Sequence, residues 1–196
     1  MELALGITGE KRAGKDEFAK ILFDLIGLFP SIALTRYAIF RYSDMIAKCL
    51  DELDIDKSRK NMQLFSPIIE AVYGAGIFSR AMTRKVLLAG LDLAVIVGVR
   101  WPSDLAELRK VGGTLVYVTA NERIRFERAR ASSEKLDEAG MTWEKFMEQE
   151  NAPTEIHIPA IGAQADFRLE NNGTMAEFRE QVYKFAVGYL PGWEQK

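Results

Sequence analysis

Short apolar runs alternate with longer amphipathic segments along the chain. Five runs have the length and the residue types of buried strands, and they lie within residues 3–8, 32–42, 91–99, 114–119 and 165–169. The run at 91–99 (LDLAVIVGV) is the most apolar stretch of the chain. This is typical of a central parallel strand that is buried on both faces.

Between these runs, apolar residues recur at helical spacing. The spacing predicts helices over residues 15–28, 45–53, 103–111, 122–131, 142–150 and 175–187, and a helical segment over 58–84 that is interrupted at 73–76. Strands that alternate with helices predict an α/β fold, in which a parallel sheet carries helices on both faces. The binding crevice of such a sheet lies at the carboxyl ends of its strands.

The first strand leads into residues 9–15 (GEKRAGK), where a helix begins. A strand, the pattern GxxxxGK and a helix together form the context of a phosphate-binding loop, or P-loop. Gly9 allows the chain to turn, and Gly14 allows the backbone to wrap around an oxyanion. The N–H groups of the loop and the helix N-terminus favour a phosphate, and Lys15 adds a full charge near the β/γ bridge. The predicted nucleotide-binding residues of the loop are Gly9, Lys11, Arg12, Ala13, Gly14 and Lys15.

The two residues after Lys15 depart from the usual pattern. A Ser or Thr normally follows the lysine and binds Mg²⁺ through its hydroxyl, but here Asp16 and Glu17 follow. Carboxylate oxygens are good ligands for Mg²⁺. We therefore expect Asp16 and Glu17 to contact the metal and the nucleotide, directly or through water. Val97 stands at the end of a strand, where an acidic residue that organises the metal is expected. In this interpretation, Asp16 and Glu17 take over the role of that acidic residue.

Two polar positions follow predicted strands and should face the same crevice. Arg100 comes directly after the most apolar run, and we expect it to contact a phosphate. Asp44 follows the second strand, where the pair Ser43-Asp44 opens the next predicted helix. Asp44 is expected to orient the acceptor or to receive its proton, and it can cap the helix as well.

Arginines on two predicted helices are the remaining candidates. Arg125 and Arg128 share one face of the helix over 122–131, while Arg130 points elsewhere. Guanidinium groups on a mobile lid neutralise triphosphate oxygens when a phosphotransferase closes. The alternative is a solvated basic face. Arg80 and Arg84 lie four residues apart and suit an acceptor phosphate, although surface ion pairs would use the same spacing.

Composition narrows the function classes. The 196 residues suit one domain, and a net charge of -2 gives no reason to expect nonspecific nucleic-acid binding. One cysteine excludes an internal disulfide and a thiolate metal cluster. With one histidine and no nucleophile motif around it, a Ser-His-Asp site is not expected. No signal peptide and no apolar run of about 18 residues is found, so we expect a cytoplasmic protein without a membrane anchor.

These motifs resemble the P-loop nucleoside monophosphate kinase superfamily. The branch of viral-type deoxynucleoside monophosphate kinases and dephospho-coenzyme A kinases is the most similar. The segments that carry the resemblance extend over nearly the whole chain, and they are residues 9–16, 42–48, 97–102, 125–130 and 165–173.

The resemblance implies a single domain with a three-layer P-loop kinase fold and a five-stranded parallel sheet. The implied core covers about residues 1–44, 91–124 and 160–196, with a helical acceptor-binding insertion at about 45–90 and a helical lid at about 125–155. It also implies adenine contacts from the lid helix, including Arg128, and from Asn171, Asn172 and Gly173. In this comparison Arg100 holds an acceptor phosphate and Asp44 faces the acceptor.

The function that follows is transfer of the γ-phosphoryl group of ATP, with Mg²⁺, to a nucleoside or deoxynucleoside monophosphate. Lys15 cradles the donor phosphates, Arg125 and Arg128 stabilise the transferring group, and Arg80, Arg84 and Arg100 hold the acceptor. An alternative is a dephospho-coenzyme A kinase-like enzyme with a hydroxyl acceptor. Another is a nucleotide-binding regulator or degenerate kinase without turnover, which the departures at Glu17 and Val97 favour. The expected partner is a small nucleotide acceptor, and the expected assembly is a monomer or homodimer.

Overall fold

Five parallel strands form one sheet in the order β2-β3-β1-β4-β5. The structure is a computed structural model that describes residues 3–29, 34–131 and 141–191, without the side chain of Arg59. The strands are β1 (Leu3–Thr8), β2 (Tyr37–Arg41), β3 (Leu93–Val97), β4 (Thr114–Thr119) and β5 (Phe167–Glu170). The α/β fold with a five-stranded parallel sheet is confirmed.

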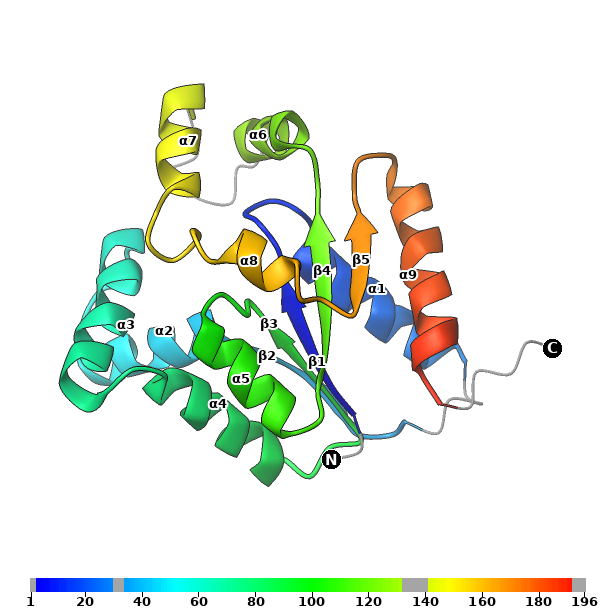
Figure 1. Ribbon diagram of the computed structural model, residues 1–196, viewed down its shortest axis with the longest axis horizontal. Helices are drawn as coiled ribbons and strands as arrows, with labels where there is room; N and C mark the ends of the chain where they lie inside the picture. Colours follow the sequence, from blue (N-terminus) through cyan, green and yellow to red (C-terminus); the bar gives the residue numbers. More distant parts are fainter. Residues whose placement is uncertain (1–2, 30–33, 132–140, 192–196) are drawn as a thin grey trace.

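Helices cover both faces of the sheet and its carboxyl end (Figure 1). The described helices are α1 (Lys15–Leu28), α2 (Tyr42–Glu52), α3 (Arg59–Tyr73), α4 (Ile77–Leu88), α5 (Pro102–Lys110), α6 (Glu122–Ala131), α7 (Trp143–Glu150), α8 (Ile158–Gly162) and α9 (Met175–Tyr189). Helices α1 and α9 pack on one face, whereas α4, α5 and α8 pack on the other. Helices α6 and α7 stand above the carboxyl ends of the strands.

The alternation of side chains along the strands builds two apolar layers. In β1, Leu5 and Ile7 face α1 and α9, while Ala4 faces the opposite layer. All residues of β3 are buried, as its apolar run predicts. A smaller cluster of Phe126, Ala129, Met141 and Phe146 joins α6 to α7. The sheet therefore fixes where its carboxyl ends lie, and the small cluster holds a separate lobe above them.

The helix starts differ from the expectations at two places. Helix α2 begins at Tyr42, directly after the extended Arg41, so Ser43 and Asp44 lie in its first turn rather than opening it. Helix α5 begins at Pro102, one residue before the predicted start, and the carboxylate of Asp104 caps it by accepting from the backbone N–H of Trp101. Both helices therefore begin at an earlier residue than the sequence predicted.

Two other features of the fold were not expected. Helix α8 has only five residues, too short for a helical repeat to be visible in the sequence. On α3, Ile68 and Val72 remain 57% and 68% exposed, so the predicted apolar stripe is only partly covered.

None of the helices in the described ranges combines the length and the apolar character that crossing a membrane requires.

Two leucines of α1 provide a matched test of the core. Leu22 is fully buried, and Leu28 at the end of the same helix is 71% exposed. We expect Leu22→Ala to lower the free energy of unfolding by about 2–5 kcal/mol, because it leaves a cavity beneath α1. Leu28→Ala should change it by less than about 0.5 kcal/mol. Urea denaturation followed by circular dichroism measures both, and equal losses would contradict the described packing.

Candidate functional site

The loop between β1 and α1 lies at the carboxyl end of the sheet, beneath α6 and α7 (Figure 1). Gly9 and Gly14 have φ values of 149° and 109°, in the region that favours glycine. A Cβ atom on Gly9 would lie 2.0 Å from the carbonyl oxygen of Val118, and one on Gly14 would lie 2.4 Å from Nδ2 of Asn171. Glycine therefore suits both positions for two reasons: neighbouring atoms lie where a Cβ atom would be, and the backbone has a positive φ.

Lys15 is the first residue of α1, and its side chain folds back against the loop. Its Nζ donates hydrogen bonds of 2.7 Å to the carbonyl oxygens of Gly9 and Glu10. The pKa of Lys15 is lowered from 10.5 to about 8, mainly because the amine is buried and also because the positive charge of Arg100 is near. The carboxylates of Glu155, Asp16 and Glu10 act in the opposite sense. Lys15 and Arg100 are thus neighbours, as the strand-end argument predicted.

Arg100 is held in place at the end of β3 by two carboxylates. Its Nη1 forms an ion pair of 2.9 Å with Oε1 of Glu155, which precedes α8. Its backbone N–H and that of Trp101 each donate a 3.0 Å hydrogen bond to Oδ2 of Asp104. Asp104 also accepts a 2.6 Å bond from the hydroxyl of Ser79. Burial raises the pKa of Asp104, although these hydrogen bonds oppose the shift.

The two arginines on the predicted face of α6 contact the P-loop itself. Arg125 is buried and donates from Nη1 to the carbonyl oxygen of Lys11 at 3.3 Å, and the same nitrogen pairs with Glu150 of α7. Arg128 donates to the carbonyl oxygen of Arg12 at 3.4 Å and to that of Asn171 at 2.9 Å. Arg130, the other arginine of the motif, is exposed, and its Nη1 lies 3.6 Å from Oε2 of Glu127.

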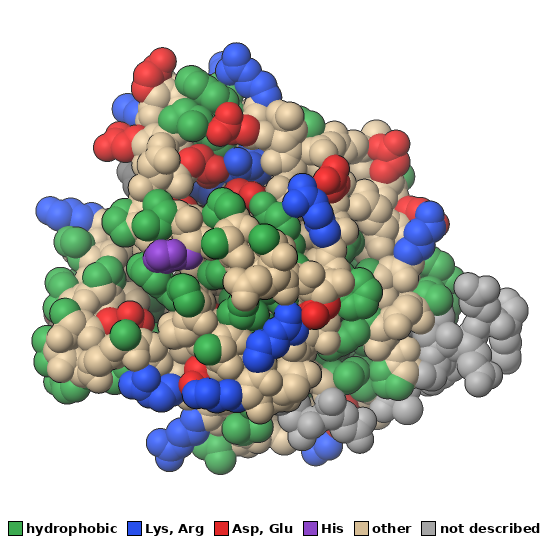
Figure 2. Space-filling view, in the orientation of Figure 1, with side chains coloured by type: hydrophobic (Ala, Val, Ile, Leu, Met, Phe, Trp, Pro, Cys, Tyr) green, Lys and Arg blue, Asp and Glu red, His purple; other side chains and the backbone are tan. Residues whose placement is uncertain are grey.

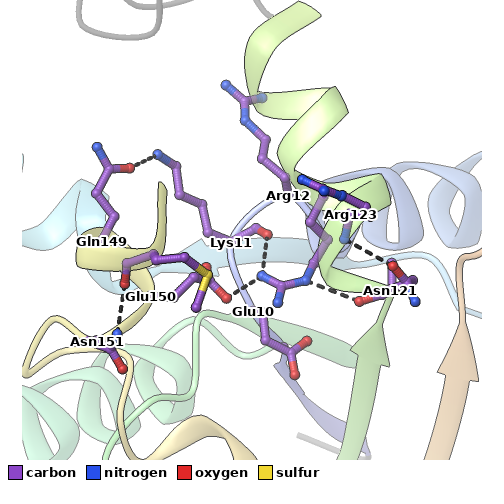
Figure 3. A network of polar contacts seen from close by, with 12 residues as sticks. Glu10, Lys11, Arg12, Asn121, Arg123, Gln149, Glu150 and Asn151 are labelled. Atoms are coloured by element: carbon purple, nitrogen blue, oxygen red, sulfur yellow. Dashed lines mark hydrogen bonds and ion pairs between the residues drawn. The ribbon is translucent and has the colours of Figure 1, made fainter. Parts of the chain in front are cut away.

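The end of α7 closes over the other side of the loop. Figure 3 shows Lys11 reaching Gln149, whose Oε1 accepts a hydrogen bond from Lys11 Nζ. Burial raises the pKa of Glu150, while its ion pair with Arg125 acts in the opposite direction. Figure 2 shows acidic and basic side chains side by side at the base of the lobe that α6 and α7 form. The lobe that α6 and α7 form and the P-loop therefore meet through polar contacts.

The segment 171–173 also adjoins the P-loop. The buried Asn171 donates from Nδ2 to the carbonyl oxygen of Ala13 at 2.9 Å. The side-chain oxygen of Asn172 accepts a 2.6 Å bond from the backbone N–H of Asn121, directly before α6. Gly173 precedes Thr174, the N-cap of α9. A pocket of about 410 Å³ on α6 is lined by Arg123, Ile124, Glu127, Arg128 and Ala131.

The remaining predicted site residues are Asp44 on α2 and Arg80 and Arg84 on α4. Asp44 is exposed in the first turn of α2, and Arg84 is exposed on α4. Arg80 donates a 2.9 Å hydrogen bond to the carbonyl oxygen of Ala75 within the 45–90 segment. Their roles at the acceptor stay predictions. Residues 132–140 of the expected lid lie outside the described residues.

The expected metal ligands are carboxylates on the first turn of α1. Asp16 is 70% exposed, and its Oδ1 pairs with Nε of Arg41 at 2.9 Å. Glu17 is partly exposed, while Val97 is buried in the apolar layer beneath α1. Across the described ranges, no group of three or more His, Cys, Asp and Glu side chains is arranged to hold a metal ion. A magnesium ion commonly binds through one or two carboxylates together with substrate phosphates, and the residues present fit that mode.

Sequence reasoning did not find Asp104, Gln149, Glu150 and Glu155. Asp104 had a local signal, because an acidic residue at the third helical position is part of a capping pattern. The three lid residues had none, since their partners lie about 25 to 138 residues away along the chain.

Comparisons with known proteins agree with this geometry. No protein-family model matches the chain. A UPF0200 protein of Thermococcus kodakarensis is 28% identical over 184 residues, which cover 91% of this chain and 93% of the relative.

Two solved structures share the architecture over nearly the full length. Shikimate kinase from Bacteroides thetaiotaomicron has a TM-score of 0.61 at 13% identity, covering 94% of this chain and 96% of that one. Dephospho-CoA kinase from Campylobacter jejuni has a TM-score of 0.54 at 16% identity, covering 95% and 97%. The expected resemblance is therefore confirmed at the level of architecture: this chain has the fold of the P-loop kinases.

Proposed function

We propose that the protein is an ATP-dependent phosphotransferase that moves the γ-phosphoryl group to a small-molecule acceptor. The observation that carries the proposal is the enclosure of Lys15. It lies at the start of α1, bonded to the carbonyl oxygens of Gly9 and Glu10, with the Arg100 charge beside it. In this position, Nζ of Lys15 can donate to phosphate oxygens in place of the two carbonyl oxygens.

The donor nucleotide fits the side of the loop that faces β4 and α6. The loop N–H groups and the N-terminus of α1 favour the phosphates. The pocket on α6, next to the contact between Arg128 and Asn171, suits the adenine base. When Mg²⁺ is bound with the nucleotide, Asp16 and Glu17 supply hard oxygen ligands, and the ion neutralises charge that develops on the phosphates.

Two side chains at the end of α7, one anionic and one neutral, are the present partners of two donor-side cations. Glu150 pairs with Arg125, and Gln149 accepts from Lys11. In the proposed reaction the nucleotide phosphates replace Glu150 as the partner of Arg125. The closed lobe then keeps water away from the transferring group.

The sequence favours a nucleoside or deoxynucleoside monophosphate as acceptor, with dephospho-coenzyme A as the alternative. A coupled assay for ADP release tests the proposal with both classes of acceptor. We expect ADP release that depends on ATP and Mg²⁺ and increases with one of these acceptors. Stabilisation of the protein by ATP without any ADP release would instead identify a nucleotide-binding regulator.

The lowered pKa of Lys15 predicts how nucleotide binding responds to pH. Below pH 8 the lysine is charged, and above pH 8 the free protein loses this proton, so binding of ATP must then take up a proton. We expect the affinity for ATP to be constant below pH 8 and to fall by up to about tenfold per pH unit above it. Isothermal titration calorimetry between pH 6.5 and 9.5 measures the profile.

Two lysine variants complete this prediction. Lys15→Ala should lose about 10- to 100-fold in ATP affinity at pH 7, and its affinity should no longer fall above pH 8. Lys20→Ala removes an exposed lysine of the same helix and should retain both the affinity and the profile. An unchanged profile in Lys15→Ala would assign the titration to another group.

The competition between Glu150 and the phosphates predicts a gain of affinity. Glu150→Gln removes the charge that pairs with Arg125, so ATP should bind about fivefold more tightly in the absence of Mg²⁺, on the order of 1 kcal/mol. Glu148→Gln makes the same chemical change at an exposed position of α7 and should have no effect. Equal affinities of the two variants, measured by calorimetry, would show that Arg125 only supports the loop.

A further inference from the structure

Only one oxygen of the Glu155 carboxylate has a partner. Oε1 pairs with Nη1 of Arg100 at 2.9 Å, and the side chain is 11% exposed. Oε2 is buried and has no hydrogen-bond donor in the part of the chain that the structure describes. A buried anionic oxygen without a donor is unfavourable. It is therefore placed to accept a hydrogen bond from a bound molecule.

The strand order shows on which side of the loop Glu155 acts. Strand β1 has β4 on one side and β3 on the other. The β4 side of the loop carries helix α6, Asn171 and the 410 Å³ pocket. This side suits the nucleoside of the donor. Arg100 follows β3, and its partner Glu155 lies near enough to Lys15 to affect its titration. Glu155 thus stands where the terminal phosphate of the donor would meet an acceptor.

Glu10 and Thr8 also have buried oxygens without a partner among the described side chains. The other carboxylate oxygen of Glu10 accepts from the hydroxyl of Tyr117 on β4, so this group belongs to the donor side. Glu155 differs because its partner is the cation at the end of β3.

The charge on this side favours a neutral acceptor over an anionic one. A phosphate acceptor would need the positive charge of Arg100, which Glu155 already neutralises at 2.9 Å. Glu155 differs from Glu150 because its Oε2 already lacks a donor among the described residues. Displacing it from Arg100 would therefore leave the whole carboxylate unpaired beside an incoming dianion, which is costly. A hydroxyl group carries no charge, and its hydrogen supplies the donor that Oε2 lacks.

We propose that the acceptor is an alcohol and that Glu155 is the general base that receives its proton. This inference rests on the proposed function and narrows its acceptor class. The acceptor O–H bond breaks as its proton passes to Oε2 of Glu155, and the acceptor oxygen bonds to the γ-phosphorus of ATP. The bond between that phosphorus and the β,γ-bridging oxygen breaks, and ADP leaves with the electron pair. The ion pair with Arg100 orients the base.

The experiment uses water as a hydroxyl acceptor that is always present. We expect wild-type protein to hydrolyse ATP slowly with Mg²⁺, and Glu155→Gln to reduce this rate at least about 100-fold, because it removes the base. ATP affinity measured by calorimetry should change less than about threefold, and thermal unfolding checks that the variant is folded. Glu148→Gln is the matched control and should behave as wild type.

A second arm identifies the product by ³¹P NMR. The hydroxyl probes are dephospho-coenzyme A, shikimate, adenosine and thymidine, and the phosphate probes are AMP and dTMP. We expect a new phosphate ester from a hydroxyl probe and no diphosphate from AMP or dTMP.

Other outcomes separate the two proposals. A diphosphate formed from AMP or dTMP, or equal hydrolysis by Glu155→Gln and wild type, overturns the alcohol inference and leaves the phosphotransferase proposal standing. Absence of both hydrolysis and transfer in wild-type protein that binds ATP overturns both proposals.

Discussion

The backbone carbonyl groups of the P-loop are the feature on which the site depends. Arg125, Arg128 and Asn171 donate to the carbonyl oxygens of three consecutive loop residues, Lys11, Arg12 and Ala13. These donors come from α6 and from the segment after β5, so the loop is held by elements far away in sequence. Protein groups thus bond the carbonyl oxygens of three consecutive loop residues, and they hold this part of the backbone in one conformation. The two arginines therefore stabilise the conformation of the loop through its backbone.

The same region must remain stable when no nucleotide is bound. Lys15 and Arg100 are neighbours at the loop, and the buried Arg125 contacts the loop from α6, so unpaired positive charge in this region would be unfavourable. Glu150 of α7 pairs with Arg125, Glu155 before α8 pairs with Arg100, and backbone carbonyl groups accept from Lys15. A ligand that brings phosphate charge to this site competes with carboxylates that are already there. Through Glu150, this arrangement links the charge balance of the loop to the position of α7.

The fold and the loop could be predicted because their signals are local. Strands β1, β3 and β4 are continuous apolar runs, and the glycines of the loop are needed for φ angles that few other residues adopt. The partners of the loop could not be predicted, since Glu150 and Glu155 meet Arg125 and Arg100 only through the packing of the lid. Asp104 was missed because its carboxylate looks like an ordinary helix cap, although it also joins α4 to the end of β3.

The end of β3 shows how the departures from the usual pattern fit together. Val97 points into the apolar layer beneath α1, so this position supplies packing rather than a metal-organising carboxylate. The next polar side chain is Arg100, which brings a positive charge to the place where negative charge is usual. The acid on this side of the loop is Glu155, which comes from the segment before α8 instead of from the sheet. Negative charge next to Arg100 is thus carried by the segment before α8.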